Sequence, residues 1–352
     1  MKVMIVGAWE QPMYEKAIAD HMKLLGHILV KVSWRKYFQS IAGKFETKYG
    51  LYGPISYVFN KHLLTVAYRE KPDIVLIWRG TQIVPNTLRL LRTQGVKSIA
   101  AYNHDDFSGP EYGAPVPNAH KRLWRHFLKC APLIDIHFVK RQSNIDHLTL
   151  LGAHAAEIMP MWFDPRIHRP IKLSSEELKK FACEVVFVGH YEPDGREKSV
   201  HALVNAGVNL KIWGGHYWSR KVLGDLYDNL QPIIPAEGDD YAKALCGAKV
   251  CLAFLSKLNR DTYTRRCFEI PACGRVMLAE RTDDLMQMFK EDEEACFFSS
   301  NEELVQKVRW LLDNPKEREQ IAQAGMRRVW TDGHDVNSRA QEFITKLNLT
   351  TI

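Results

Sequence analysis

Long apolar runs are missing from this chain. None of its 352 residues falls in a stretch of about 18 consecutive apolar residues, the length that a membrane-spanning helix needs. The first ten residues, MKVMIVGAWE, hold only a short apolar run before Glu10, so they do not resemble a secretion signal. We therefore expect a soluble, cytoplasmic protein.

Cysteine is scarce and lacks the spacing of a metal site. The chain has seven cysteines, an odd number, and no C-x-x-C pair. These features argue against both a disulfide framework and a structural zinc site. We expect the cysteines to be reduced and mostly buried.

Three nucleotide-binding motifs are also absent. The apolar run KVMIVG is followed by AWEQP and the run CEVVFVG by HYEPDG, so neither carries G-x-G-x-x-G, and no P-loop occurs elsewhere. Binding of NAD and P-loop binding of a nucleotide therefore lose their support. The chain also has no Asp-x-Asp motif. We predict that it uses neither a metal ion nor another cofactor.

The composition is that of an ordinary globular protein. Hydrophobic residues make up 46% of the chain and charged residues 25%, without low-complexity tracts or repeats. Because single hydrophobic cores rarely grow beyond about 250 to 300 residues, this length predicts two domains.

Positive charge is concentrated in the N-terminal half. Residues 1–172 contain 24 Lys and Arg against 13 Asp and Glu, whereas the remaining residues contain 24 against 28. Such asymmetry is typical of a protein region that meets an anionic partner, although a solvated basic surface without a partner gives the same pattern. A membrane face, a phosphorylated acceptor and nucleic acid are the candidates. Nucleic acid is the weakest, because no nucleic-acid-binding fold signature accompanies the charge.

Strand-like and helix-like segments alternate through the N-terminal half. Short apolar runs occur at 2–7, 27–34, 73–80, 96–103 and 134–140, and helical stretches at 12–25, 86–95 and 119–129 lie between them. This alternation predicts a parallel sheet with helices on both faces. Residues 36–70 look helical but irregular. Their aromatic side chains could line an acceptor groove, although packing in the core is the commoner use and the one we expect (Tyr37, Phe38, Phe45, Tyr49, Tyr52, Tyr57 and Phe59).

A second alternation follows a proline-rich segment. MPMWFDPRIHRP, residues 159–170, has three prolines and no periodicity, so we interpret it as an extended interdomain linker. The fold class we predict is α/β, with two tandem doubly wound Rossmann-like domains that face a central cleft, followed by C-terminal helices. We place the N-terminal domain at residues 1–165, the C-terminal domain at 166–335, and a final helix that returns to the N-terminal domain at 336–352.

The stretch LNRDTYTRRCFEIPACGRVMLAE, residues 258–280, is the most informative part of the sequence. Seven residues separate Asp261 from Glu269, two arginines lie between these acids, and Gly274 ends the apolar segment. This arrangement resembles the retaining GT-B glycosyltransferases, which carry two glutamates with the same spacing. Three segments are most similar to glycosyl transferases of group 1, in the branch of the spore-maturation-like proteins. They are RCFEIPACG, HDVNSRAQEF near the C-terminus, and the linker MPMWFDPRIHRP.

The resemblance implies roles for individual residues in binding a nucleoside-diphosphate sugar, with UDP or GDP as the expected nucleotide. It implies that Glu269 accepts hydrogen bonds from the ribose hydroxyls, a role that suits an ionised carboxylate. The first acid of the family touches the transferred sugar, but here it is Asp261, one methylene shorter, which puts that role in doubt. The diphosphate is expected near the start of a helix and near a second basic pair, Arg196 and Lys198. The other residues expected at this site are Gly189, Thr264, Arg265, Arg266 and Gly274.

A polar loop in the N-terminal half follows the predicted strand at 96–103. His104, Asp105 and Asp106 open this loop, YNHDDFSGPEYGAP, at the carboxyl end of a strand, where catalytic groups gather. They could deprotonate or orient the acceptor hydroxyl, or the two aspartates could simply cap the turn. Trp9 and Glu10, in the first strand-to-helix loop, are expected to face the same cleft.

Together these observations predict a glycosyltransferase of the hexosyl type, with the acceptor bound by the N-terminal domain and the nucleotide-sugar donor by the C-terminal domain. Retention of the anomeric configuration is implied only by the resemblance. Its expected partners are the nucleotide-sugar donor, a glycan, lipid-linked or protein acceptor, and an anionic membrane surface at the inner face of the membrane. Two alternatives remain open. One is a sugar-nucleotide epimerase on the same scaffold, and the other is a degenerate protein that binds the sugar nucleotide without turnover.

Overall fold

The computed structural model describes residues 1–109, 116–215 and 217–349. The chain divides into two compact units. Unit 1 contains Met1–Met161 together with the segment from Val336 onward, and unit 2 contains Trp162–Asp335. The first boundary lies four residues before the predicted one, and the later part of the polar loop, residues 110–115, lies outside the described residues.

Unit 1 is built on a six-stranded sheet with the order β2-β1-β3-β4-β5-β6, in which every pairing is parallel. Strands β1 and β3 are apolar runs with almost no exposed residue, as expected where helices cover both faces of a parallel sheet. The strands are β1 (Lys2–Gly7), β2 (Ile28–Ser33), β3 (Ile74–Trp78), β4 (Ser98–Asn103), β5 (Ile136–Val139) and β6 (Ala156–Ile158).

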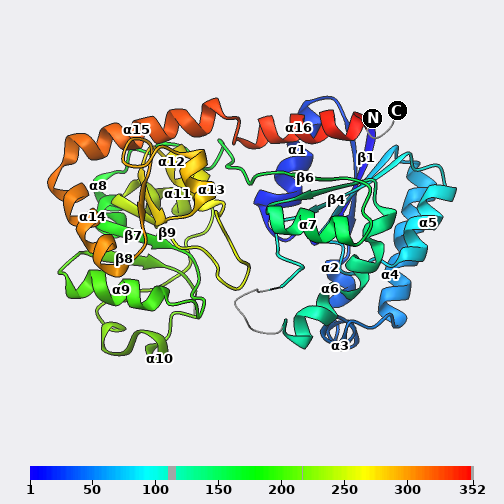
Figure 1. The fold of residues 1–352 in the computed structure, drawn as a ribbon, viewed down its shortest axis with the longest axis horizontal. Helices are drawn as coiled ribbons and strands as arrows, with labels where there is room; N and C mark the ends of the chain where they lie inside the picture. The colour runs from blue at the N-terminus through cyan, green and yellow to red at the C-terminus, as the bar shows by residue number, and fades with distance from the viewer. Residues whose placement is uncertain (110–115, 216, 350–352) are drawn as a thin grey trace. The chain divides into compact units, whose positions relative to one another are not determined.

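The helices of unit 1 connect these strands, as Figure 1 shows. They are α1 (Ala17–Leu24), α2 (Arg35–Phe38), α3 (Ile41–Tyr49), α4 (Pro54–Glu70), α5 (Pro85–Thr93), α6 (Asn118–Cys130), α7 (Gln142–Leu150) and the C-terminal α16 (Val336–Leu349). Helix α16 packs against α1, and its Phe343 contacts the rings of Tyr102 on β4 and Phe138 on β5. The last helix is thus part of the core of unit 1.

The aromatic residues of α2, α3 and α4 correct one expectation. Phe38 and Phe59 are buried, but four others are between 37% and 55% exposed, namely Phe45, Tyr49, Tyr52 and Tyr57. Packing in the core, the use that we expected, is therefore wrong for most of this set. The reason is that α3 packs mainly against the helices α2, α4 and α6 rather than against a strand, so few of its side chains reach the core.

Unit 2 has a five-stranded parallel sheet with the order β11-β10-β9-β7-β8. Its strands are β7 (Cys183–Val188), β8 (Leu210–Trp213), β9 (Ala248–Ala253), β10 (Val276–Glu280) and β11 (Cys296–Phe298). Its helices are α8 (Ser175–Phe181), α9 (Arg196–Asn205), α10 (Arg220–Leu223), α11 (Asp239–Cys246), α12 (Arg266–Ala272), α13 (Asp283–Met288), α14 (Asn301–Asp313) and α15 (Pro315–Thr331). The predicted α/β class with two parallel sheets is confirmed.

The proline-rich segment is not a free linker. Within unit 2, the Phe163 N–H donates to the carbonyl of His334 over 3.0 Å, and the Phe163 side chain is fully buried. His168 is also fully buried. The second half of the predicted linker is therefore packed into unit 2.

All seven cysteines are buried and unpaired, as predicted. Among the helices of the described ranges, none is both long and apolar enough to span a membrane.

Candidate functional site

The carboxyl ends of β7 and β9 mark the switch point of the unit 2 sheet, because β8 lies on one side of β7 and β9, β10 and β11 lie on the other. Such points are where open parallel sheets bind ligands. Gly189 follows β7 directly, and its carbonyl accepts a hydrogen bond from Trp218 Nε1 at 2.9 Å. The Arg266 Nε donates to the carbonyl of Val188 at 2.6 Å, so this guanidinium lies against the end of β7.

Gly189 and Arg266 are thus brought together, as the predicted site requires. A Cβ atom at position 189 would clash with the Arg266 guanidinium and would lie 2.8 Å from the Phe187 ring. Glycine is needed here because the arginine passes so close to the backbone.

Glu269 lies on α12 and has no exposed surface. Its carboxylate forms an ion pair with Arg265, accepts a hydrogen bond from the Tyr241 hydroxyl of α11, and has His168 Nε2 at 3.5 Å from its Oε1. Burial alone would raise the pKa of Glu269, but Arg265, His168 and the Tyr241 hydrogen bond outweigh burial and hold that pKa below its ordinary value. Glu269 is therefore an anion at neutral pH.

His168 and Tyr241 are two members of this cluster that the sequence did not reveal. The His168 Nδ1 accepts a hydrogen bond from the Asp164 N–H at 2.9 Å, so the ring proton lies on Nε2, which faces Glu269. Burial lowers the pKa of His168 and raises that of Tyr241 well above its ordinary value. Neither residue lies in a motif, and only the fold brings them to α12.

The segment before α12 contains Asp261 and Thr264, both partly exposed. The Asp261 N–H donates to the carbonyl of Ser256 at 2.9 Å, and the Thr264 N–H contacts Cys267 Sγ at 3.5 Å. The backbone of this segment is thus held at the carboxyl end of β9.

Arg196 has a different setting from the predicted one. Its side chain is 3% exposed, forms an ion pair with Asp194, and donates from Nη1 to the carbonyl of His190 at 2.8 Å. The structure uses this arginine to hold the loop after β7. Lys198, by contrast, is exposed and lines a pocket of about 570 Å³ with Lys257 and Glu280.

Gly274 lies at the opposite end of α12 from Arg265. Its φ of +66° and its N–H donated to the carbonyl of Pro271 at 2.8 Å show that it terminates the helix. Its nearest neighbours beyond the helix are Pro170 and Met326. The geometry therefore gives Gly274 a structural role, and its contact with the nucleotide stays a prediction.

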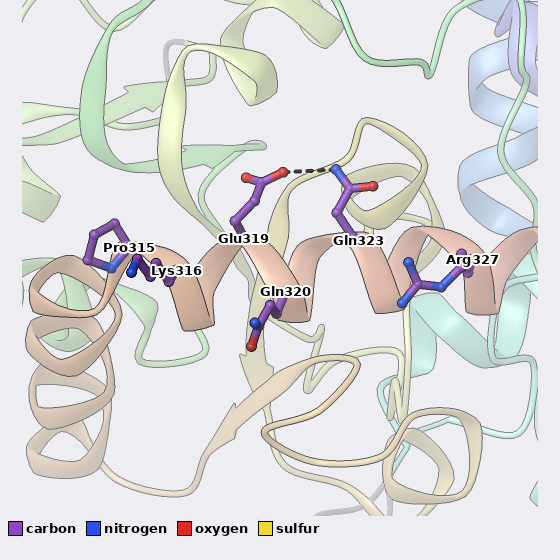
Figure 2. A pocket seen from close by; sticks show the side chains of 6 residues that line it. All are labelled: Pro315, Lys316, Glu319, Gln320, Gln323 and Arg327. Atoms are coloured by element: carbon purple, nitrogen blue, oxygen red, sulfur yellow. Dashed lines mark hydrogen bonds between the residues drawn. The ribbon is translucent and has the colours of Figure 1, made fainter.

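A further hollow runs along α15, and Figure 2 shows the six side chains that line it. All six belong to this one helix, and the Gln323 amide donates to Glu319 at 2.8 Å. No second element contributes a group from the other side, so the hollow is a shallow helix face without the convergent groups of a binding site.

In unit 1, His104 and Asp105 follow β4 and meet Arg79, which follows β3. The Arg79 Nε lies 3.0 Å from Asp105 Oδ2, and His104 Nε2 lies 3.6 Å from Asp105 Oδ1. The His104 ring also stacks on Tyr14, with centroids 4.6 Å apart. Arg141, after β5, donates to the carbonyl of His104 at 3.0 Å.

The electrostatics of this cluster keep His104 neutral. Burial lowers the pKa of His104 to about 4, although Asp105 acts in the opposite direction. Burial also opposes ionisation of Asp105, but His104, Arg79 and Arg141 outweigh it, so the pKa of Asp105 lies below its ordinary value. The pair offers a neutral imidazole beside a carboxylate, a combination that can accept a proton.

Asp106 does not join this pair. It is fully buried, and its Oδ1 accepts hydrogen bonds from the Ser108 N–H at 3.0 Å and the Asn144 amide at 2.9 Å. These bonds are those of the turn-capping alternative, in which the aspartate fixes the loop.

Trp9 and Glu10 are turned toward the segment that contains β2. Trp9 Nε1 donates to the carbonyl of Val32 at 3.2 Å, and Glu10 forms an ion pair with Arg35. Within the described part of the chain, no three His, Cys, Asp or Glu residues form a cluster that could hold a metal ion.

Comparisons with known proteins concern the family and the fold of the chain. Residues 196–345 match the model of a family described as glycosyl transferase-like. No curated protein matches the sequence. Solved structures with the same fold include HepE of Anabaena in complex with UDP and glucose, which is 12% identical, with 99% of each chain covered and a TM-score of 0.66.

Two further structures share the fold over nearly the whole chain. A glycosyltransferase from Rickettsia africae is 14% identical, with 99% of this chain and 98% of that chain covered and a TM-score of 0.68. Sucrose-phosphate synthase from Thermosynechococcus elongatus is 12% identical, with the same coverage and a TM-score of 0.70. The narrower resemblance to the spore-maturation-like branch stays a prediction. The family match thus covers less than half of the chain, and the solved structures show which fold the chain shares.

Proposed function

We propose that this chain transfers a sugar from a UDP-sugar to an acceptor hydroxyl, with retention of the anomeric configuration and without a metal ion. The observation that carries the proposal is the ionised carboxylate of Glu269, held by Arg265, His168 and Tyr241 inside the segment that matches the glycosyl transferase-like family. UDP is favoured over GDP because HepE, which has the same fold, binds UDP and UDP-glucose.

In this proposal, the ribose hydroxyls of the donor donate to Glu269 in place of the Tyr241 hydroxyl. Ionised Glu269 offers two oxygens to such donors, and Tyr241 shows that one of them already accepts a hydroxyl. The Arg266 guanidinium, which passes close to the Gly189 backbone, would meet the diphosphate at this point.

The departing nucleoside diphosphate gains negative charge, which the protein must stabilise. Arg266 is held at the end of β7 by its bond to Val188, and Arg265 begins the same helix. Lys198 and Lys257 line the neighbouring pocket. These four cations are the basis for proposing catalysis without a metal ion, and activity that disappears with a chelator and returns with manganese would contradict it.

The acceptor is proposed to bind to unit 1, where His104 and Asp105 would orient its hydroxyl and accept its proton. His104 is neutral at pH 7, because burial holds its pKa at about 4, and its side chain keeps 19% exposure. A glycan, a lipid-linked sugar or a glycosylated protein could present this hydroxyl.

We also propose that unit 1 contacts an anionic membrane through the surface of α3 and α6, which pack against each other. Exposed apolar side chains line one side of α3 at intervals of four residues, namely Ile41, Phe45 and Tyr49. The same two helices carry six basic residues, and none forms an ion pair with a carboxylate of the described residues (Lys44, Lys48, Lys121, Arg122, Arg125 and Lys129). Lys48 and Arg122 lie over the Tyr49 ring. Aromatic rings beside cations are the composition of interfacial membrane contacts.

Nucleotide binding can be tested by thermal unfolding with UDP, GDP, CDP, ADP and TDP. A ligand that binds only the folded state stabilises it by about 2.7 kcal/mol at a hundredfold excess over its Kd, so UDP should raise the Tm of the natural protein. Glu269→Gln should lose this shift. Glu46→Gln is the matched control, because Glu46 is a buried glutamate of unit 1, and it should keep the shift even if its own Tm is lower. Equal shifts with all nucleotides, or none, would overturn the proposed donor.

Product analysis separates the proposed transferase from its alternatives. The transferase releases UDP only with an acceptor, an epimerase forms a new sugar nucleotide without one, and a degenerate binding protein does neither. An NMR assignment of the product anomer tests retention, and inversion would contradict it.

A further inference from the structure

Unit 1 has a pocket of its own, with a volume of about 290 Å³. Three segments form most of it. Trp34 follows β2, the residues Arg79, Thr81 and Gln82 follow β3, and Lys44 and Lys48 belong to α3. The pocket is therefore at the carboxyl end of the sheet, the edge where parallel sheets bind ligands.

The charge of this pocket is positive. Lys44 and Lys48 are exposed, lie one helical turn apart on α3, and form no ion pair with any carboxylate of the described residues. Glu46, the acidic residue of the same helix, forms an ion pair with neither lysine among the described residues. It is buried, and its carboxylate accepts hydrogen bonds from the N–H groups of Ile55 and Ser56 at 2.9 and 2.8 Å, at the start of α4.

Arg79 adds a third cation, whose position is fixed. The backbone N–H of Arg79 donates to the carbonyl of Tyr102 at 3.0 Å. Its guanidinium lies 5.5 Å from the centre of the Trp124 ring, and its Nε lies 3.0 Å from the Asp105 carboxylate. Asp105 offsets the charge of Arg79, and the two lysines leave the pocket with an excess of positive charge.

The remaining lining suits a small polar molecule with a carbon skeleton. Thr81 and Gln82 offer a hydroxyl and an amide, and the Gln82 amide donates to the Thr47 hydroxyl at 3.4 Å. Trp34, Phe38 and Leu123 form an apolar wall. Hydrogen-bonding groups beside an aromatic wall are common where proteins bind small polar ligands.

Arg79 also connects the pocket with the groups proposed to receive the acceptor hydroxyl. Its Asp105 partner has His104 at 3.6 Å on the other carboxylate oxygen. Asp105 thus joins Arg79 of the pocket to His104 of the proposed acceptor site.

We propose that this pocket binds a phosphate group of the acceptor, so that the acceptor is a sugar or lipid that carries phosphate. The inference rests on the proposed function, since it names the class of acceptor for the same transfer. The phosphate would lie between Lys44, Lys48 and Arg79, with the carbon skeleton against Trp34. Three cations around one phosphate provide charge-assisted hydrogen bonds, which are stronger than neutral ones.

The test uses the full chain and the double variant Lys44→Ala/Lys48→Ala, which changes only exposed side chains. Lys23→Ala/Lys61→Ala is the control, because it removes the same charge from exposed positions of α1 and α4, outside both the pocket lining and the surface of α3 and α6. Binding of inorganic phosphate, hexose 6-phosphates and the matching neutral hexoses is measured by calorimetry. A second arm measures binding to two kinds of phosphatidylcholine vesicle. One kind contains a polyprenyl phosphate, and the other contains enough phosphatidylglycerol to give the same surface charge.

Tighter binding of a hexose phosphate than of its neutral hexose, weakened at least tenfold in the Lys44/Lys48 variant and not in the control, supports a soluble phosphorylated acceptor. Preference for polyprenyl phosphate over phosphatidylglycerol, lost only in the same variant, supports a lipid-linked one. Equal binding of neutral and phosphorylated ligands in both arms, or equal weakening in both variants, overturns the proposal. The Tm shift with UDP is measured on the same samples. If UDP fails to bind while phosphate still binds to the pocket, the proposed donor fails and the pocket remains.

Discussion

The Tyr241 hydroxyl donates a hydrogen bond to the carboxylate of Glu269, and these two residues come from α11 and α12. The same carboxylate forms an ion pair with Arg265. Because the carboxylate is charged and the Tyr241 hydroxyl is neutral, removing the charge of Glu269 should affect nucleotide binding more than removing the hydroxyl of Tyr241.

We expect Tyr241→Phe to keep UDP binding within about threefold, since the ribose hydroxyls would take the place of the lost hydroxyl. The variant should lose about 1 kcal/mol of unfolding free energy, the net value of one hydrogen bond. Glu269→Gln should weaken UDP at least tenfold, because a neutral amide accepts hydrogen bonds less strongly than a carboxylate. Calorimetry with UDP and urea unfolding check both values. A Tyr241→Phe variant that loses UDP as completely as Glu269→Gln would show that the phenol itself holds the nucleotide.

Arg266 should contribute to binding of the diphosphate and not of the nucleoside. We expect Arg266→Gln to weaken UDP about tenfold and to leave uridine unchanged, because a charge-assisted hydrogen bond to phosphate is worth about 1.5 to 3 kcal/mol. Arg309→Gln, which changes an exposed arginine of α14, is the matched control. Equal losses for UDP and uridine would instead indicate that Arg266 holds the end of β7 through Val188.

The elements of both sheets could be predicted because buried parallel strands are nearly continuous apolar runs. KVMIVG and CEVVFVG became β1 and β7. The local chemistry around Glu269 could also be predicted, because Arg265 lies one helical turn before it. His168 and Tyr241 could not, because their contacts with Glu269 depend on how α11 and the segment after Trp162 pack on α12.

Exposure was harder to predict than secondary structure. Phe45 and Phe59 are the same residue type in neighbouring helices, yet Phe45 is 55% exposed and Phe59 is fully buried. Helical structure alone does not say which side meets the sheet when aromatic residues occur on several sides. Arg196 presents the same difficulty, since its pairing with Asp194 is set by the loop after β7.

Gly274 should matter for stability and not for the nucleotide. Alanine at φ +66° costs roughly 1 kcal/mol in conformation, and its Cβ would also lie 3.3 Å from Pro170. Gly207→Ala is the matched control, because Gly207 has φ +79° with no atom within 4 Å of the added Cβ. We expect the Gly274→Ala variant to have the lower Tm of the two and to keep the UDP-induced shift. Loss of that shift in a folded Gly274→Ala protein would return the residue to the donor site.

Acid should weaken unit 1 through His104. Its folded-state pKa of about 4 lies below the ordinary value of 6.5, so the unfolded chain binds more protons between these values. The stability from keeping His104 neutral is therefore fully present above pH 6.5 and is lost as the pH falls toward 4. At pH 5 the loss is about 2 kcal/mol. Urea unfolding at pH 7 and pH 5 measures how much unfolding free energy each protein loses in acid. This loss should be smaller for His104→Asn than for the natural protein. It should be unchanged for His154→Asn, which alters an exposed histidine. The same acid sensitivity in all three proteins would contradict this role of His104.

Phe45 tests the proposed membrane contact. It is 55% exposed on α3, and its ring lies 4.6 Å from that of Tyr49. Phe45→Ser should reduce sedimentation with phosphatidylglycerol vesicles at least fivefold, since burying one aromatic side chain contributes about 1.5 to 3 kcal/mol. The Tm should change little, because the ring is not part of the core.

Tyr68→Ser is the control for this experiment, since Tyr68 is 72% exposed on α4, outside the surface of α3 and α6. Added salt distinguishes the two contributions to binding. Salt should weaken the attraction of the basic residues to the anionic headgroups, whereas the difference between Phe45→Ser and the natural protein should persist, because insertion of an apolar ring is not screened. Equal sedimentation of both variants, or equal binding to neutral and anionic vesicles, would show that the exposed rings of α3 do not meet a membrane.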